Sequence, residues 1–394
     1  MPDAHLEPDL VAVALPPGTG PVAVRPVRTA ADARRFQDFP YRLYAGHRFY
    51  VPPLRAEQAK TLSPKKNPFF EHGRMALFLA ERGNHVVGRV AAIVNGRHLE
   101  THRDGAGFFG FFECVEDEDV AGALLNAAAG YLRAVGMKTM RGPTNPTLND
   151  TAGLLVDGFL REPFILMPYN PPYYERLLTR HGLTRVMTMW AYYVHAANVD
   201  HARFKRGVDV VYRRHPDLRV RPLDRRRLGQ EVAAAMRIYN AGWAGNWGHV
   251  PYTEAEAQHL AADLKQILDP DLFLFAELSG EPVAFSVSLP NVNAALRHVP
   301  DGRLFPLGLP RLLAHARFGA VHELRMPLMG VLPEHQGRAF DVPLIYETIR
   351  TGRRKGFDAC EMSWVLETNT RLINALENLG AVRDKEYALF ERAL

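Results

Sequence analysis

The chain has little cysteine and no long apolar run, and both shortages narrow the classes of protein it can belong to. Cys114 and Cys360 are its two cysteines, and neither stands in a CxxC pair or a Cys/His zinc pattern. We therefore expect no disulfide framework and no metal site. No segment approaches the roughly 18 consecutive apolar residues that a membrane span requires. Asp3, Glu7 and Asp9 lie where a secretory signal carries positive charge. The sequence predicts a soluble protein of a reducing cytoplasm.

The rest of the composition is typical of a globular chain. Of the 394 residues, 47% are apolar and 23% are charged, which excludes a collagen-like, low-complexity or wholly disordered protein. At roughly 100 to 200 residues per domain, the length predicts two domains, with three as the upper limit.

Positive charge is concentrated in one stretch. The formal net charge is +5, yet ten Lys or Arg and three Asp lie between Ala202 and Leu228. The first interpretation is a solvated face near a domain junction. The second is peripheral contact with an anionic membrane surface, at the inner face of the membrane, because lipid headgroups attract such a cluster. No nucleic-acid-binding motif accompanies the charge, so no nucleic acid is expected as a partner.

Two hairpin-like segments indicate an internal repeat. Strand-like runs at 77–81 and 86–94 flank a Gly-Asn turn, and similar runs at 272–277 and 283–289 flank a Ser-Gly turn. In both hairpins a Glu is followed by a Val six residues later. The first Glu is residue 81 and the second is residue 277, which sets the period of the repeat at 196 residues.

A second match extends the repeat. The helix pattern at 120–135 ends at Gly136 and the pattern at 343–355 ends at Gly356, and glycine is a common helix stop. Strands and helices alternate in both copies, which predicts an α/β fold of two tandem domains with mixed sheets flanked by helices. We expect a flexible tail at 1–20, one copy at 21–197 and the other at 198–394. In the second copy we also predict strands at 323–332, 359–366 and 386–392 and helices at 309–318 and 370–379.

The most informative segment of the second copy runs from Gly330 to Asp341 and reads GVLPEHQGRAFD. A strand ends in Val-x-Pro, and a loop of small residues then opens a helix. Such a loop lets backbone N–H groups approach phosphates closely. The segment resembles motif A of the GNAT (Gcn5-related N-acetyltransferase) superfamily, in which loop and helix hold the pyrophosphate of an acyl-coenzyme A. The resemblance implies that acyl-CoA is the co-substrate.

The resemblance continues to the C-terminus, where Asn369, a helix and Gly380-Ala381 match the superfamily's ending. In that family the Asn and the helix flank the pantetheine arm of the coenzyme. Two positions depart from the family pattern: Asp341 stands where the last small residue belongs, and Leu376 stands where many members carry a Tyr general acid. The resemblance assigns acyl-CoA binding to Met329, Val331, Gln336, Gly337, Arg338, Ala339 and Asn369.

The first copy differs at this loop. Aligning Gly136 with Gly356 places Glu116-Asp117-Glu118-Asp119 on the loop residues 336–339. Four consecutive carboxylates would repel a pyrophosphate by several kcal/mol in a partly buried site. We therefore expect the first copy to be a degenerate domain that does not bind coenzyme A and that builds the acceptor side.

The whole chain, from about residue 25 onward, resembles the bacterial ceramide synthase-like (YghO-like) group of tandem GNAT proteins. The segments that carry the likeness include residues 40–58, 142–159 and 240–251. The resemblance implies N-acylation of a long-chain sphingoid base, 3-oxosphinganine, by a fatty acyl-CoA. Two alternatives stay open: a GNAT acyltransferase acting on another small amine or an aminoacyl group, and a non-catalytic acyl-CoA-binding protein.

Two groups of residues are candidates for binding the acceptor. Trp243, Asn246 and Trp247 combine apolar surface with a polar group, as ligand pockets do. The alternative is a helix end with buried aromatic residues. Asn145 and Asn149 lie in a loop rich in Gly and Pro, where they either face a ligand or satisfy their own backbone in turns.

An amine acceptor must lose a proton as it attacks the thioester. We predict that Glu361, His249 or Glu367 accepts that proton; for Glu361 the alternative is a solvent-facing acid on a strand. The backbone N–H groups of 329–331 are candidates for stabilising the thioester oxyanion. The sequence contains no Ser/His/Asp or Cys/His arrangement, which favours direct transfer over a covalent acyl-enzyme.

Overall fold

A computed structural model describes residues 13–317, 319 and 321–394, which divide into two compact units. Unit 1 comprises the chain up to Met189, together with Asn293–Ala316 and Lys385–Leu394. Unit 2 comprises Trp190–Val292 and Arg317–Asp384. Two long strands, β9 (Thr184–His195) and β15 (Val382–Ala393), contribute residues to both units.

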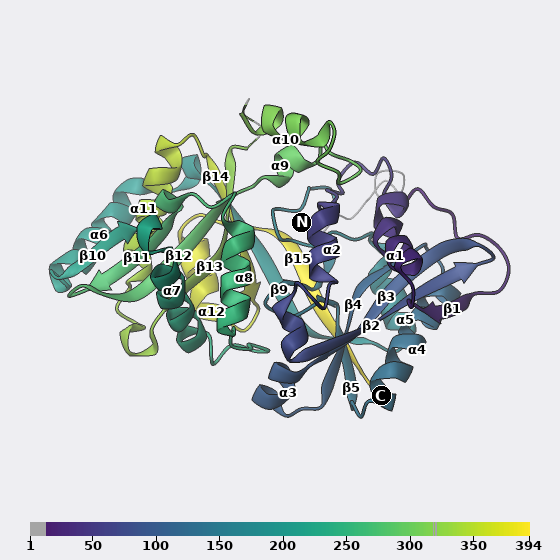
Figure 1. The fold of residues 1–394 in the computed structure, drawn as a ribbon. Helices are drawn as coiled ribbons and strands as arrows, with labels where there is room; N and C mark the ends of the chain where they lie inside the picture. The colour runs from purple at the N-terminus through teal and green to yellow at the C-terminus, as the bar shows by residue number, and fades with distance from the viewer. Residues whose placement is uncertain (1–12, 318, 320) are drawn as a thin grey trace. The chain divides into compact units, whose positions relative to one another are not determined.

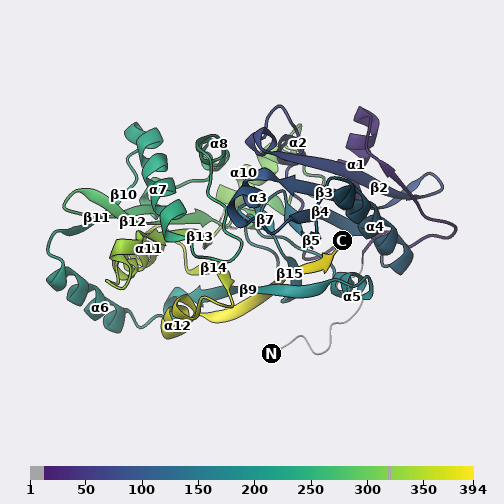
Figure 2. The ribbon, with the colours of Figure 1, turned by 90° about the horizontal axis from the view of Figure 1, so that it is seen from below.

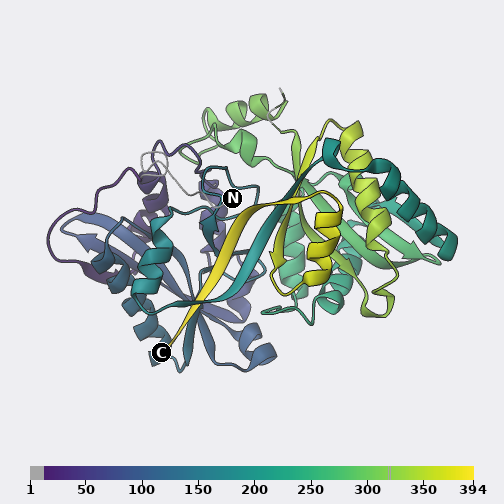
Figure 3. The ribbon, with the colours of Figure 1, turned by 180° about the vertical axis from the view of Figure 1, so that it is seen from behind.

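Unit 1 is built on a mixed sheet with the order β1-β2-β3-β4-β5-β15, and β8 also pairs with β15 (Figure 1). The β4–β5 pair is parallel. β9 also lies beside β15 (Figure 3). The strands are β1 (Ala23–Pro26), β2 (Gly73–Arg82), β3 (His85–Asn95), β4 (Ala106–Cys114), β5 (Thr139–Gly142) and β8 (Leu154–Asp157), with a separate hairpin of β6 (Thr144–Asn145) and β7 (Thr151–Ala152).

The helices of unit 1 bury its core against this sheet. On α4, Leu124, Leu125 and Ala128 are fully buried at the spacing of an amphipathic helix, and they join one apolar cluster with strands β2 to β4. The helices are α1 (Ala30–Leu43), α2 (Arg55–Thr61), α3 (Gly96–His102), α4 (Glu118–Ala134), α5 (Tyr173–Arg180), α9 (Asn293–Leu296) and α10 (Gly308–Arg317).

Unit 2 is built on a five-stranded segment of mixed sheet with the order β14-β13-β12-β11-β10. Its β13–β14 pair is parallel. Figure 2 shows α7 and α8 on one face of this sheet and α6 and α11 on the other. The strands are β10 (Leu218–Pro222), β11 (Phe273–Leu278), β12 (Glu281–Pro290), β13 (Glu323–Val331) and β14 (Ala359–Leu366), and the helices are α6 (His201–Arg214), α7 (Leu228–Gly242), α8 (Glu254–Leu264), α11 (Asp341–Arg354) and α12 (Thr370–Asn378).

The two units repeat one ionic contact at the period predicted from the sequence. In unit 1, Arg25 on β1 binds Glu81 on β2, with an Nε–Oε2 distance of 2.9 Å. In unit 2, Arg221 on β10 binds Glu277 on β11, with an Nε–Oε1 distance of 2.6 Å. Both residues of the pair are displaced by the same 196 positions, and both hairpins bulge next to the Glu. The predicted repeat is confirmed.

The predicted elements of both copies are present among the described residues, and residue 318, the last of the helix predicted at 309–318, lies outside them. The compact units do not follow a linear boundary at residue 198. Ten residues (96–105) separate β3 from β4, whereas 32 residues (291–322) separate the equivalent strands β12 and β13. This insertion contains α9 and α10, and most of it packs with unit 1. The extent of the two sequence copies stays a prediction.

The predicted tail at 1–20 is described from residue 13 onward, and residues 1–12 lie outside the described residues. Ala14 N–H donates to the Leu43 carbonyl at 2.7 Å. Arg82 Nη1 donates to the carbonyl of Pro17 at 2.7 Å and to that of Gly18 at 3.0 Å. These contacts hold residues 14–18 against unit 1.

Candidate active site

A cavity of about 400 Å³ opens in unit 2 where the parallel strands β13 and β14 stop pairing. Their register ends at Met326 and Met362. The next residue of β13 is Pro327, which has no N–H to donate, and it lies at a bulge where β13 has one more residue than β12. Beyond this point both strands line the cavity, together with the C-terminal end of α7, the loop before α11, and α12.

The loop before α11 has the backbone geometry of a phosphate-binding loop. Gly337 has a φ of +85° and Ala339 a φ of +60°, and for an alanine the left-handed region costs about 1 kcal/mol. Among the described residues, no side chain caps α11. Val342 N–H donates to the Ala339 carbonyl at 3.1 Å and Pro343 has no N–H, so the backbone of the preceding loop is the main source of donors for an anion here. Gly337 and Ala339 line the cavity. The arrangement provides backbone donors and a helix dipole for a phosphate group.

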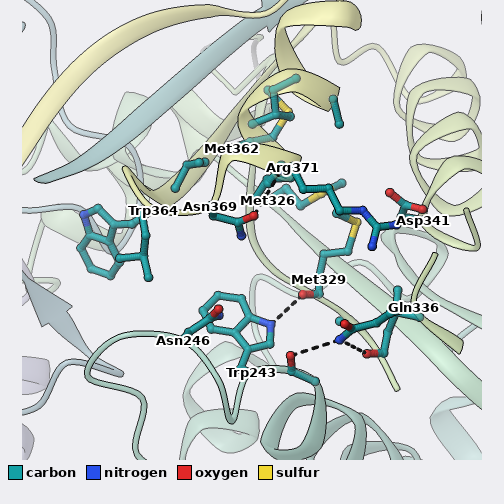
Figure 4. Close-up of a pocket in the computed structure, with 18 of the residues that line it drawn as sticks. Trp243, Asn246, Met326, Met329, Gln336, Asp341, Met362, Trp364, Asn369 and Arg371 are labelled. Carbon is teal, nitrogen blue, oxygen red and sulfur yellow. Dashed lines mark hydrogen bonds between the residues drawn. The ribbon is translucent and has the colours of Figure 1, made fainter. Parts of the chain in front are cut away.

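The end of α7 contacts both β13 and the loop before α11. Trp243 Nε1 donates to the Met329 carbonyl at 2.9 Å, and Gln336 Nε2 lies 3.3 Å from the Val331 carbonyl (Figure 4). A methyl group on Gly242 would lie 2.7 Å from that same Val331 oxygen, so this close approach of helix and strand requires glycine. Trp243, Asn246 and Trp247, predicted as acceptor-binding residues, all line the cavity.

Helix α12 provides the other wall. Asn369 lines the cavity and caps this helix, since its Oδ1 accepts from Leu372 N–H at 3.2 Å. Figure 4 shows the Arg371 side chain extending across the cavity toward Asp341. Arg371 therefore provides positive charge opposite the residue that departs from the family's small-residue pattern. Leu376 is buried and also lines the cavity.

A buried polar group lies directly behind the cavity wall. Ser363 Oγ donates to Glu361 Oε1 at 2.7 Å and accepts from Arg325 Nε at 2.9 Å. Glu361 is fully buried, so it is not the solvent-facing acid that the sequence allowed as an alternative. Ser363 lines the cavity and Glu361 does not. The hydroxyl of Ser363 thus connects the cavity to a carboxylate that is one hydrogen bond away.

Several predicted residues lie elsewhere. His249 is buried with its ring centroid 5.3 Å from that of Tyr239, Glu367 and Arg338 are exposed, and these three do not line the cavity. Asn145 and Asn149 belong to unit 1.

Sequence reasoning did not assign a role to several residues that line the cavity, among them His335, Ser363, Trp364 and Arg371. A positive residue in the first turn after Asn369 was a signal available for Arg371. The role of Ser363 was not readable, because the alternation of a strand places Ser363 and Glu361 on one face but does not show that this face meets the cavity.

Two residues of unit 1 have local structural roles where ligand contact was predicted. Asn145 Oδ1 accepts from Phe111 N–H at 2.5 Å. Asn149 N–H donates to Thr147 Oγ1 at 3.1 Å, which is turn chemistry of the kind expected for this loop.

The acidic run of unit 1 is occupied by other residues of the same unit. Asp117 caps α4, with Oδ1 accepting from Val120 N–H at 3.0 Å, and Arg82 Nη1 lies 2.9 Å from its Oδ2. Arg176 pairs with Glu116 and with Glu118 at 2.8 and 3.0 Å. The N-terminus of α4 is therefore already occupied by a carboxylate of its own unit.

Two features are absent from the described part of the chain. Across residues 13–317, 319 and 321–394, no group of three His, Cys, Asp or Glu comes together as a metal site. Over the same ranges no helix combines the length and apolarity needed to cross a bilayer.

Comparison with solved structures defines the class of fold. The chain matches a tandem GNAT protein from the clavulanic acid biosynthesis pathway with a TM-score of 0.56 and 10% identity, covering 95% of this chain and 98% of that one. It matches the GCN5-related glucosamine N-acetyltransferase region of a fungal multi-domain β-N-acetylglucosaminidase with a TM-score of 0.57 and 13% identity, covering 95% and 38% of the two chains. The fold is therefore that of a tandem GNAT protein.

Two curated relatives identify the family. The chain is 35% identical over 384 residues to the bacterial ceramide synthase of Caulobacter vibrioides (strain NA1000 / CB15N), covering 95% of this chain and 98% of that protein. It is 33% identical over 376 residues to protein YghO of Escherichia coli (strain K12), covering 94% and 95%. No family model matches the sequence. The chain belongs to the family of the bacterial ceramide synthase and YghO.

Proposed function

We propose that this protein is an acyl-CoA-dependent N-acyltransferase that acylates a long-chain sphingoid base, 3-oxosphinganine, in bacterial ceramide synthesis. The observation that carries the proposal is the cavity between β13 and β14 beside the uncapped N-terminus of α11. The near-full-length likeness to a bacterial ceramide synthase supports the choice of acceptor.

The coenzyme end of the cavity is assigned to the loop before α11. Backbone N–H groups around Gly337 and Ala339 donate to the pyrophosphate, and the helix dipole adds to this attraction. Arg371, which points toward Asp341 (Figure 4), compensates the one acidic side chain at this end. The pantetheine arm then runs between β13 and β14, with Asn369 on its α12 side.

The chemical step is a direct transfer. The amine nitrogen of the acceptor forms a bond to the thioester carbonyl carbon, the C–S bond breaks, and the coenzyme leaves as a thiolate. The amine loses a proton to Ser363 Oγ as the Ser363 proton passes to Glu361 Oε1, along the 2.7 Å hydrogen bond. The same relay returns the proton to the thiolate. Arg325, 2.9 Å from Ser363 Oγ, orients that hydroxyl.

The proposal includes a cytoplasmic location with peripheral contact at the inner face of the membrane. Both substrates carry long apolar chains that partition into lipid. Nine of the ten Lys and Arg in the stretch 202–228 are exposed, as a membrane-facing cluster requires. The tenth, Arg221, is bound to Glu231 and Glu277 and is structural.

A mass-spectrometric assay with palmitoyl-CoA, 3-oxosphinganine and a panel of other amines tests the proposal. We expect an N-acyl product from the sphingoid base. Product from a different amine alone would show that this amine, and not the sphingoid base, is the acceptor. Acyl-CoA binding without any product would instead establish a non-catalytic binder, a function that Leu376 at the cavity wall favours.

Two variants test the relay. Ser363→Ala and Glu361→Gln should each lower kcat about a hundredfold, the usual size of a general-base effect, while the dissociation constant for acyl-CoA stays within about twofold. Glu367→Gln is the matched control, because Glu367 is exposed and does not line the cavity. If Glu367→Gln lowers kcat and Glu361→Gln does not, the base is assigned to the wrong carboxylate.

A further inference from the structure

A basic and apolar tip projects from the insertion between β12 and β13, and we infer that this tip docks on an anionic lipid bilayer. The tip comprises residues 303–317 and includes α10, which lies beside α9 at the top of Figure 1. Phe305, Leu307 and Leu313 are 74%, 59% and 58% exposed. In the described part of the chain, five large apolar side chains are exposed, and these three fall within nine residues.

The charge of the tip selects an anionic lipid partner. Arg303, Arg311 and Arg317 are exposed. From Gly302 to His322 the sequence contains no Asp or Glu. Apolar side chains flanked by arginines and free of acids match the acyl layer and the phosphates of a bilayer surface.

The base of the insertion is fixed to unit 1, which holds the tip exposed. Asn293 Nδ2 donates to the Pro163 carbonyl at 2.8 Å, and Arg55 N–H donates to the Gly302 carbonyl at 3.0 Å. Val299 between them is 2% exposed. The fixed base thus extends to Gly302, and the exposed apolar residues begin three positions later, although Gly308 within the tip is itself buried.

On α10 the exposed and covered positions separate along the helix. Leu309, Leu312 and His315 are half-buried, whereas Arg311, Leu313 and Arg317 are exposed. The helix therefore presents an arginine-flanked leucine away from the rest of the insertion, as an interfacial helix does.

This inference rests on the proposed function, because the long-chain substrates of that reaction would reach the cavity from a bilayer. The insertion is also specific to the copy that holds the cavity, since its counterpart between β3 and β4 has ten residues.

Co-sedimentation of the full chain with phosphatidylcholine vesicles, with and without phosphatidylglycerol, tests the inference. We expect binding to the anionic vesicles that weakens with salt. The triple variant Phe305→Ser/Leu307→Ser/Leu313→Ser should reduce that binding at least about tenfold. Arg303→Gln and Arg311→Gln should each reduce it about fivefold.

Two controls locate the effect. Val382 is 61% exposed and lies outside the tip, so Val382→Ser should bind as the wild type does. Arg225→Gln/Arg226→Gln/Arg227→Gln probes the basic stretch at 202–228. Loss of binding in this variant with retention in the triple variant would move the membrane contact to that stretch and overturn the inference.

Two further outcomes overturn it as well: a wild-type protein that ignores anionic vesicles, and a wild-type dimer in sedimentation that the triple variant abolishes, which makes the tip a protein interface. The proposed function is measured separately, as acyl transfer in detergent. The triple variant should keep its detergent kcat within about twofold. If the protein binds vesicles but has no transferase activity, the inference that the tip docks on a bilayer stands and the proposed function is wrong.

Discussion

The N-termini of α4 and α11 follow matched loops in the two copies and have opposite roles. Asp117 caps α4 and pairs with Arg82, so carboxylates fill the positive end of that helix. Among the described residues no side chain caps α11. Gly337 and Ala339, both with positive φ, are small enough to let an anion come close to the backbone before this helix. The same supersecondary unit therefore serves either as a self-satisfied support or as an anion site, depending on four residues.

The parallel strands show a second difference. The pairs Phe108–Arg141 and Arg325–Glu361 occupy the same place in the two ladders. Two residues further on, Gly110 lies so close to the Thr144 carbonyl that a methyl group would be 1.7 Å from it. Unit 2 has Pro327 and Trp364 at these two positions, and both line the cavity. In unit 1, Gly110 lets the two strands stay close together. In unit 2, Trp364 is bulky and Pro327 has no N–H to pair, so the two strands separate around the cavity.

The largest expected effect tests the anion site. Gly337→Glu should weaken acyl-CoA binding about a thousandfold, roughly 4 kcal/mol, because a carboxylate would face the pyrophosphate. Isothermal titration measures it. Gly337→Ala imposes the same left-handed strain without charge and should cost only a few-fold. Asp117→Asn, the equivalent position of unit 1, keeps the cap and should bind normally. Equal losses at Gly337 and Asp117 would contradict the claim that one copy is degenerate.

Protonation of His98 should lower the stability of unit 1 and leave that of unit 2 unchanged. Burial lowers the pKa of His98 from 6.5 to about 4, against the opposing effect of Asp104, 3.2 Å away. The unfolded chain then binds more protons, so stability is present above pH 6.5 and is lost as pH falls toward 4. The loss is on the order of 3 kcal/mol. Hydrogen exchange of β3 and β4 measures it, and His98→Gln should flatten the pH dependence while β13 amides stay unaffected in both proteins.

Gly110→Ala tests the closure of unit 1. The added methyl group meets the Thr144 carbonyl, and we expect a loss of about 2 kcal/mol in the free energy of unfolding, as for other overpacked sites. Urea denaturation followed by circular dichroism is the measurement. The folded fraction should bind acyl-CoA with unchanged affinity, and weakened binding would show that unit 1 contributes to the coenzyme site.

The smallest effect concerns the caps. Asp117→Ala removes the α4 cap and should destabilise the protein by about 1 kcal/mol. Asp341→Ala removes no cap hydrogen bond among the described residues, so stability should change little while acyl-CoA binds more tightly. A thermal shift of the same size in both variants would erase the distinction between the two helix ends.

Much of this protein was readable from the sequence because the signals are local. The period between Glu81 and Glu277, the glycines after the two long helices and the loop GVLPEHQGRAFD each depend on neighbouring residues. They predicted the duplication and the α/β class. Six of the seven residues that the GNAT resemblance assigned to acyl-CoA binding line the cavity: Met329, Val331, Gln336, Gly337, Ala339 and Asn369.

The remaining features required tertiary structure, because they depend on residues that are distant in the chain. Asn145 binds Phe111 N–H within unit 1, Arg371 points toward Asp341 (Figure 4), and Glu361 is linked to the cavity through Ser363. A strand pattern places Glu361 on one face but does not say whether that face is solvent, core or cavity. Packing decides this, since it determines which buried polar groups find partners.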